Sequence, residues 1–149
     1  MSVSVSAAAY RLCEAMDWSI SQLSAQKGIY LAHMIHLGEN DGKPLVSEAF
    51  QAWEYGPVLP SLYQDLKMFG RKPIKNVFWS SKAEDGTSEA NAIDSVVGQI
   101  KGMSAARLVH ITHHPDGAWA KHYAAAKKGV VIPNTDILAE YEWRRKKAA

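Results

Sequence analysis

Residues 48–60 constrain the fold of this chain most, because they place two prolines and a glycine directly after a group of aromatic residues. The ring of Pro57 excludes the preceding Gly56 from helical backbone angles, and glycine reaches angles that other residues avoid. Pro60 suits the first turn of a helix, where its missing N–H costs nothing. We therefore expect a helix that ends near Tyr55, a sharp corner, and a new helix after it.

Apolar residues recur at three- and four-residue steps along most of the chain, and this spacing predicts helices. The most apolar stretch, residues 23–37, predicts a central core helix that begins after an N-cap at Ser19 and ends at Gly38. Gly28 inside this helix indicates that a neighbouring element packs closely there. Further helices are expected over residues 4–17, 47–55, 60–70, 87–100, 104–112, 119–123 and from 134 onward.

Two short segments rich in β-branched and aromatic residues interrupt these helices, at residues 73–79 and 129–133. We expect residues 77–79 to pair with residues 130–132 as a two-stranded flap. The polar and charged residues 80–86 between the helices predict a mobile loop. The predicted fold class is therefore mainly α: a compact multi-helix single domain over residues 1–149 with one small two-stranded β flap.

The chain has the length of one domain, and its bulk composition is that of a globular protein. Its single cysteine, Cys13, cannot form an internal disulfide, which fits a reducing compartment. No apolar run reaches the length of a membrane span, and the N-terminus lacks the basic and apolar regions of a signal peptide. We expect a cytoplasmic protein with no membrane partner.

Charge is distributed unevenly along the sequence. Residues 1–100 hold eight Lys/Arg and eleven Asp/Glu, a net −3, whereas residues 101–149 hold nine and four, a net +5. The basic run at residues 144–147 is typical of a solvated helix end, and an anionic partner is the alternative. No nucleic-acid partner is expected, because residues 59–65 after the corner are apolar and acidic, a poor surface for a DNA groove.

The side chains that carry chemistry do not form a recognisable catalytic pattern. His110, His113 and His114 have the spacing of one helix face and are the types that bind zinc, but no Cys or acidic pair completes a site. The sequence has no phosphate-binding glycine loop and no serine in a strand-to-helix elbow. We predict no enzyme, no catalytic residue, no metal ligand and no cofactor. The alternative kept open is a metal-dependent enzyme centred on His110 and His113.

Protein–protein recognition remains as the favoured function. Five Trp and six Tyr exceed the needs of one core, and both residue types are enriched in binding hot spots. Trp79 beside the charged loop and Trp119 in a turn are the candidate surface anchors. An equal alternative is that both rings close the edge of the core.

Three segments of the chain carry a family resemblance. Residues 27–32, Lys-Gly-Ile-Tyr-Leu-Ala, resemble a helix motif K-L-x-Y-x-A, although Gly28 departs from it. Pro44-Leu45 and residues 48–58 resemble the signature P-L … E-x-F-x-A-W-x-Y-G-P-V, and residues 108–113 with Trp119 resemble L-x-x-x-T-H … W. Over about residues 20–145 the chain is identified as a member of the Panacea antitoxin domain family, whose best-known branch is the SocA-like antitoxins.

The resemblance implies a function and its partners. Members are bacterial antitoxins, found on mobile elements and near phage genes, that bind and neutralise a protein toxin encoded beside them. In the SocA-like branch the antitoxin resembles a proteolytic adapter that delivers its toxin to the ClpXP protease, so the ClpX unfoldase is a second expected partner. The alternative is direct stoichiometric inhibition of the toxin without proteolysis.

The resemblance also ranks individual residues. Most of the signature is expected to be structural, and Glu54 and Tyr55 are its tentative partner-binding members. The two candidate surface anchors, Trp79 and Trp119, complete the tentative partner-binding set. The last two residues, Ala148 and Ala149, resemble the end of degradation tags that the same protease reads, so a protease tether is the hypothesis and a frayed end is the alternative. The signature residues expected to be mainly structural are Lys27, Tyr30, Trp53, Gly56, Pro57, Thr112 and His113.

Overall fold

The structure is a computed structural model that describes residues 2–76 and 79–148. In this part of the chain no helix has the length and apolarity needed to cross a membrane. The mainly α fold class is confirmed, with a small antiparallel sheet added. The elements in chain order are α1 (Val5–Ala15), α2 (Gln22–Glu39), β1 (Phe50–Trp53), β2 (Gly56–Val58), α3 (Pro60–Leu66), the short 3-10 helix η1 (Lys67–Phe69), α4 (Ser88–Ile100), α5 (Ala105–Thr112), α6 (Ala118–His122), β3 (Val130–Ile132) and α7 (Asn134–Ala148).

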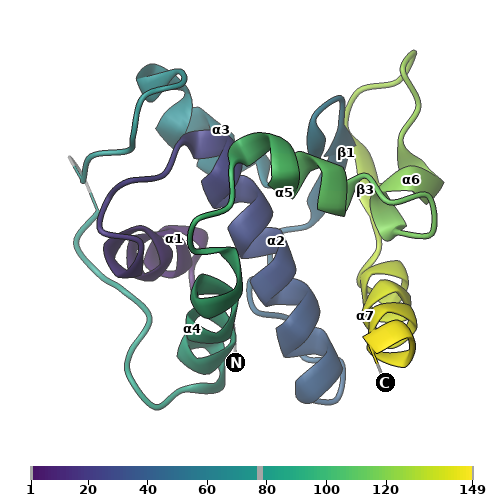
Figure 1. Cartoon of the computed structure of the whole chain (residues 1–149), viewed down its shortest axis with the longest axis horizontal. Helices are drawn as coiled ribbons and strands as arrows, with labels where there is room; N and C mark the ends of the chain where they lie inside the picture. The colour runs from purple at the N-terminus through teal and green to yellow at the C-terminus, as the bar shows by residue number, and fades with distance from the viewer. Residues whose placement is uncertain (1, 77–78, 149) are drawn as a thin grey trace.

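Helix α2 is the central core helix, as predicted. It passes through the middle of the molecule, with α1 and α4 on one side and α7 on the other (Figure 1). Buried residues occupy its whole circumference over residues 24–30, which is the pattern of a helix enclosed by other elements, whereas Leu31, Ile35 and Gly38 form a partly exposed face further along. The close packing expected at Gly28 is confirmed, because a Cβ added there would lie 2.9 Å from Cδ2 of Leu12 on α1.

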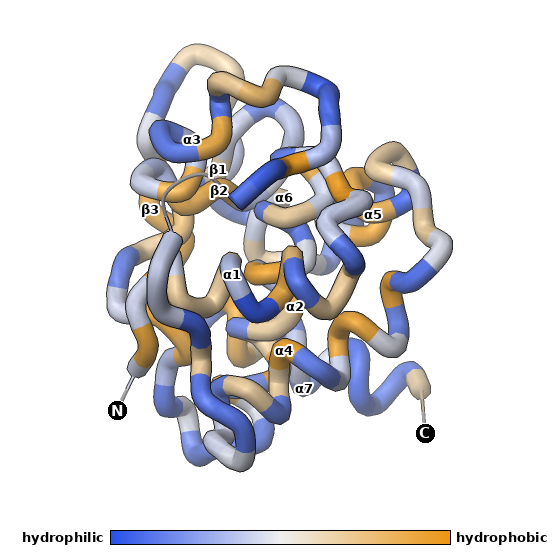
Figure 2. The backbone as a smooth tube through the Cα atoms, turned by 90° about the vertical axis from the view of Figure 1, so that its left-hand side faces the viewer, coloured by the Kyte–Doolittle hydropathy of each residue, from blue (hydrophilic) through white to orange (hydrophobic). Residues whose placement is uncertain are grey.

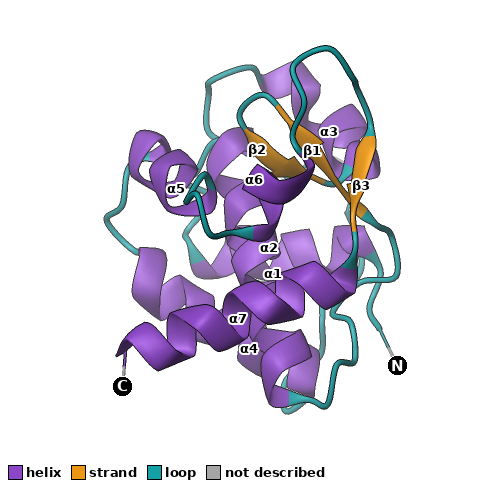
Figure 3. Cartoon of the chain, turned by 90° about the vertical axis from the view of Figure 1, so that its right-hand side faces the viewer, coloured by secondary structure: helices purple, strands orange, loops and turns teal. Residues whose placement is uncertain are grey.

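The sheet and α3 lie at one end of the molecule, and α4 and α7 lie at the other (Figures 2 and 3). Three helices begin after a side chain that accepts a hydrogen bond from the first turn: Ser4 for α1, Thr87 for α4 and Ser104 for α5. The cap of α2 is Ser21 rather than the expected Ser19.

The expected helix over residues 47–55 is wrong, because this segment forms a β-hairpin. Strand β1 pairs antiparallel with β2, from Gln51 opposite Val58 to Trp53 opposite Gly56. Burial alternates along β1, with Phe50 buried and Gln51 partly exposed, which is the two-residue period of a strand. A window this short does not separate that period from a helical one. The corner itself and the helix that starts at Pro60 are confirmed.

The expected two-stranded flap is also wrong in its partner. The predicted extended segment does form β3, but it pairs with β1, from Phe50 opposite Ile132 to Ala52 opposite Val130, so the sheet has the order β2–β1–β3. The sequence predicts a helix over β1, so β1 is not available there as a partner for β3, and this is why the pairing differs. Val77 and Phe78 lie outside the described residues, and Trp79 lies in an irregular segment.

The charged loop at residues 80–86, which we expected to be mobile, is fixed to α1. The Arg11 guanidinium donates hydrogen bonds to the backbone oxygen of Ala83 at 2.9 Å and to the carboxylate of Asp85. It also makes an ion pair with Asp94 on α4. Ala83 is itself buried, and its N–H bonds to the carbonyl of Ala7. The charges that suggested an exposed loop therefore serve to anchor it.

The crossing of α2 and α7 generates a stability prediction. A Cβ at Gly38 would overlap the ring of Tyr141 on α7, so Gly38→Ala must push the two helices apart. We expect it to lower the free energy of unfolding by about 1–3 kcal/mol, the range for overpacking, in urea denaturation followed by circular dichroism. The control is Gly98→Ala on α4, where a Cβ would meet no atom within 4 Å; it should be neutral or stabilising by up to about 1 kcal/mol. Equal effects at the two glycines would contradict the close helix crossing.

Candidate partner-binding surface

The hairpin is attached to α2 by a buried lysine. Lys27 is 0% exposed, and its Nζ donates a hydrogen bond to the backbone oxygen of Pro57 at 2.9 Å. Burial lowers the pKa of this amine to about 7. Gly56 has φ +118°, and a Cβ on it would lie 2.8 Å from Cε of Lys27. Glycine is therefore required at this position both by its backbone angle and by the lysine beneath it.

The end of α5 supports the hairpin from a second side. The Thr112 hydroxyl donates to the Leu108 carbonyl at 3.0 Å and lies 3.2 Å from the Cβ position of Gly56. The ring of His113 stacks on that of Trp119, with centroids 3.7 Å apart and an interplanar angle of 3°. Burial lowers the pKa of His113, and the nearby Lys27 lowers it further.

Trp119 joins the hairpin directly. Its indole Nε1–H donates to the backbone oxygen of Trp53 at 2.7 Å. The ring of Trp53 in turn packs edge-on against Tyr63 of α3, with centroids 5.0 Å apart. The two distant signature segments, at residues 48–58 and 108–119, thus meet beneath the hairpin. These contacts are the reason that we infer a structural role for both segments.

Tyr30 is tied to α7 instead. It is fully buried, and its hydroxyl donates to Oε1 of Glu140 at 2.7 Å. The same carboxylate oxygen accepts the N–H of Ala118 at 2.9 Å, and Oε2 accepts from Nε of Arg144 at 2.8 Å. Sequence reasoning missed Glu140 and Arg144. Their four-residue spacing was the only signal, and it does not reveal that the glutamate is buried.

The turn of the hairpin is exposed. It consists of Glu54 and Tyr55 alone, and Tyr55 is 62% exposed. These are the signature residues expected to face a partner, and the structure places both at the surface. Val131 on β3, 48% exposed, is a second large apolar side chain on the same small sheet.

A cleft lies on the outward side of the sheet, and we call it the hairpin-face cleft. It has a volume of about 700 Å³. Its floor is β1, one wall is α3 and the other is the segment from α6 to β3. Val131 lies opposite Gln51 in the register, so the two side chains share this face of the sheet. The side chains that define its character are Gln51, Trp53, Glu54, Tyr63, Tyr123, Lys127 and Lys128.

The sequence of this chain was compared with known protein families, and the match covers both the hairpin and the residues that support it. The sequence model of the family described as "Antitoxin SocA-like, Panacea domain" matches residues 26–120. The chain belongs to this family. The matched region contains Lys27, the hairpin, Thr112, His113 and Trp119, which are the residues that meet beneath the hairpin. The resemblance seen in the motifs is therefore confirmed.

A similar curated protein is Antitoxin SocA from Caulobacter vibrioides (strain NA1000 / CB15N). It is 33% identical over 117 residues, which are 70% of this chain and 61% of that protein. The chain thus matches less than two thirds of the length of this relative. No solved structure matches this chain.

The two candidate tryptophan anchors have different positions in this Panacea domain. Trp79 is only 8% exposed and packs near Trp18, with ring centroids 6.4 Å apart. Its role as a surface anchor is therefore wrong, and it closes the edge of the core. Trp119 is half-buried, between the stacked rings of His113 and Tyr123. It supports the hairpin from below rather than standing at the tip.

The three histidines in and directly after α5 lie in different surroundings. His110 is exposed, His113 stacks on Trp119, and His114 packs beside Trp143 with Nδ1 3.8 Å from a carboxylate oxygen of Asp116. Among residues 2–76 and 79–148, no three His, Cys, Asp or Glu side chains are grouped so that they could hold a metal ion. The geometry therefore gives the metal-enzyme alternative no support.

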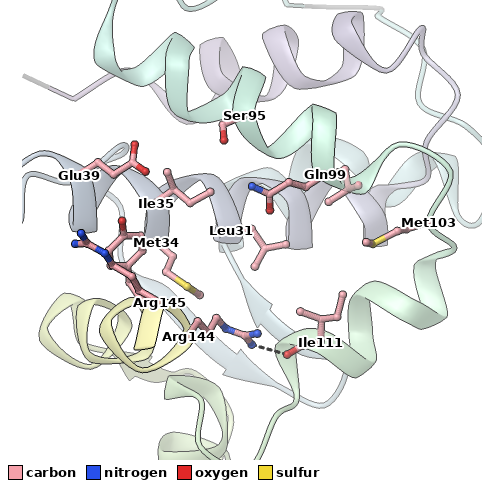
Figure 4. A pocket seen from close by; sticks show the side chains of 12 residues that line it. Leu31, Met34, Ile35, Glu39, Ser95, Gln99, Met103, Ile111, Arg144 and Arg145 are labelled. Atoms are coloured by element: carbon pink, nitrogen blue, oxygen red, sulfur yellow. Dashed lines mark hydrogen bonds between the residues drawn. The ribbon is translucent and has the colours of Figure 1, made fainter. Parts of the chain in front are cut away.

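A second groove crosses α2 between α4 and α7 and has a volume of about 340 Å³; it shares no lining residue with the hairpin-face cleft. Figure 4 shows Leu31 and Ile35 on its floor, with Arg144 reaching across to the carbonyl of Ile111 at 2.7 Å. Met103, 38% exposed, lies at one end. This groove provides a reference surface against which the hairpin face can be tested.

Lys27 predicts a pH dependence of stability. Its pKa is about 7 when folded and 10.5 when exposed, so between these values the unfolded chain binds a proton that the folded chain lacks. This group should therefore raise the free energy of unfolding with pH, by up to about 1.4 kcal/mol per pH unit. The rise should be clearest between pH 7 and 9, because burial raises the pKa of the Cys13 thiol from 9.0 to about 12 and this thiol acts in the opposite direction at higher pH. Lys27→Met should remove that rise, as measured by urea denaturation at a series of pH values.

The matched control for this experiment is Lys146→Met, which changes an exposed lysine. The control should keep the wild-type dependence on pH. If Lys27→Met and the control gave parallel curves, the amine would not be neutral in the folded protein.

Proposed function

We propose that this protein is an antitoxin that binds a protein toxin and neutralises it through the hairpin face, meaning the turn residues Glu54 and Tyr55 together with the hairpin-face cleft. The observation that carries this proposal is the family match over residues 26–120, which includes the hairpin. The relative's printed name, Antitoxin SocA, agrees with it. The role is one of binding, and no catalytic step is assigned to the chain.

The hairpin face has the physical properties of a binding surface. Its side chains include the exposed Tyr55 and the partly exposed Trp53, two residue types that dominate binding hot spots. The backbone beneath them is held by Lys27 and by the indole of Trp119. A surface that is already ordered loses little conformational entropy on binding, which favours affinity.

For the mechanism of neutralisation we infer a proteolytic adapter, which delivers the toxin to the ClpXP protease in the bacterial cytoplasm. The support for this is the resemblance to the SocA-like branch. An adapter needs a second contact, with the ClpX unfoldase, and Ala148 and Ala149 are the candidate tether. Ala148 is exposed at the end of α7, and Ala149 lies outside the described residues. Direct stoichiometric inhibition is the second candidate.

The exposed turn provides the first test. Tyr55→Ala removes a side chain that is mostly in solvent, so the melting temperature should remain that of the wild type. Binding to the protein encoded beside the antitoxin gene should weaken by roughly tenfold or more, the range for a hot-spot tyrosine, in isothermal titration calorimetry. Met103→Ala in the groove of Figure 4 is the control and should bind normally. Normal binding by Tyr55→Ala would remove the turn from the interface.

Trp53→Ala should behave differently from Tyr55→Ala. Its ring packs on Tyr63 in the hairpin-face cleft and its strand holds the hairpin in register. We expect this variant to unfold, as followed by circular dichroism. A folded Trp53→Ala protein that fails to bind toxin would show that the ring is part of the interface rather than of the scaffold.

A strain without ClpX separates the two mechanisms. An adapter should lose protection against the toxin in that strain, whereas a direct inhibitor should retain it; growth and toxin half-life are measured in parallel. Replacing Ala148 and Ala149 together by Asp should lengthen the toxin half-life if these residues form the tether. Full protection without ClpX would exclude the adapter mechanism and leave the antitoxin role intact.

A further inference from the structure

The lysines of the hairpin-face cleft give it a specific chemical character. Lys127 and Lys128 are both exposed and line the same cleft as the rings of Trp53, Tyr63 and Tyr123. The carboxylate that lines it is that of Glu54, at the turn. A ligand of this cleft must therefore offer apolar surface to the rings and negative charge to the two amines.

The shape of the cleft indicates the conformation of its ligand. Its floor is the outward face of a sheet, where side chains alternate with a period of two. The lining comes from residues 51–54, at the end of β1, and from residues 123–129 beside them, so the cleft follows the course of a strand. An extended segment that lies along such a strand places alternate side chains into the cleft.

We propose that the hairpin-face cleft binds an extended segment of the partner protein in which apolar and acidic side chains alternate. This inference rests on the proposed function and specifies which part of the toxin is recognised. The segment lies along the end of β1, between α3 and residues 123–129. It places an apolar side chain against Trp53 between the two tyrosines, and a carboxylate against Lys127 or Lys128.

A protein segment fits this cleft better than a nucleic acid does. Aromatic rings with lysines also bind single strands, but such sites follow the phosphate backbone with a continuous basic groove. Here the basic groups are two neighbouring lysines on one wall, and Glu54 is acidic. Lysines at a strand edge can also serve only to prevent aggregation, and the experiment includes that outcome.

The test compares two charge reversals in the full chain. Lys127→Glu with Lys128→Glu reverses the charge of the cleft wall. Lys146→Glu with Lys147→Glu makes the same change in net charge on exposed residues near the end of α7. The probe is the purified protein encoded beside the antitoxin gene. We expect the cleft reversal to raise the Kd about tenfold or more, and the α7 reversal to change it by less than about threefold.

A second measurement identifies the paired groups. Carbodiimide couples a lysine amine to a carboxylate that touches it, and mass spectrometry then locates the bond. We expect cross-links from Lys127 or Lys128 to Asp or Glu within one segment of the toxin. Moderate salt should weaken binding by the wild type and have less effect on the cleft reversal.

The outcomes separate this inference from the proposed function. If the wild type does not bind the neighbouring protein, the proposed function fails. If the wild type binds and both reversals have equal effects, the toxin is recognised elsewhere and this inference alone is overturned. It is also overturned if the cleft reversal abolishes binding of a single-stranded oligonucleotide while toxin binding is unchanged.

Discussion

The hydrogen bond from Lys27 to the carbonyl of Pro57 is the interaction on which the rest of this domain depends. An ammonium or amine enclosed by a protein core loses its hydration, and the loss is tolerated only where a good acceptor replaces water. The lysine therefore fixes the position of the hairpin over α2. It also requires a glycine above it, because a side chain at Gly56 would occupy the space of the lysine.

The contacts of the signature residues indicate that most of them hold the hairpin in place rather than contact a partner protein. Lys27, Thr112, His113 and Trp119 hold the hairpin from below, and few members of the signature reach solvent. Such a motif identifies a fold and does not identify a partner. Under the proposed function, specificity resides in the side chains of the turn and the cleft that the signature leaves variable, such as Glu54 and Lys127. Both are exposed, so a related domain can change them without disturbing the core.

The sequence predicted the helices well, because long segments repeat their apolar spacing several times and carry serine or threonine caps. It failed at residues 48–55, where four strand residues give too few repeats to distinguish the two periods. The partner of β3 was missed for the same reason. The turn residues Glu54 and Tyr55 were found from the motif. Lys127 and Lys128 were not singled out, since only the fold brings them beside Trp53 and Tyr63.

Helix α7 lies beyond the region that defines the family, which ends at residue 120. Yet the carboxylate of Glu140 satisfies both the hydroxyl of Tyr30 and the N–H of Ala118 inside that region. A fragment cut at the family boundary would leave both donors without an acceptor and would uncover one side of α2. The smallest fragment that can fold within another protein is therefore longer than the family region. A fusion that contains only the family region needs another helix in the position of α7.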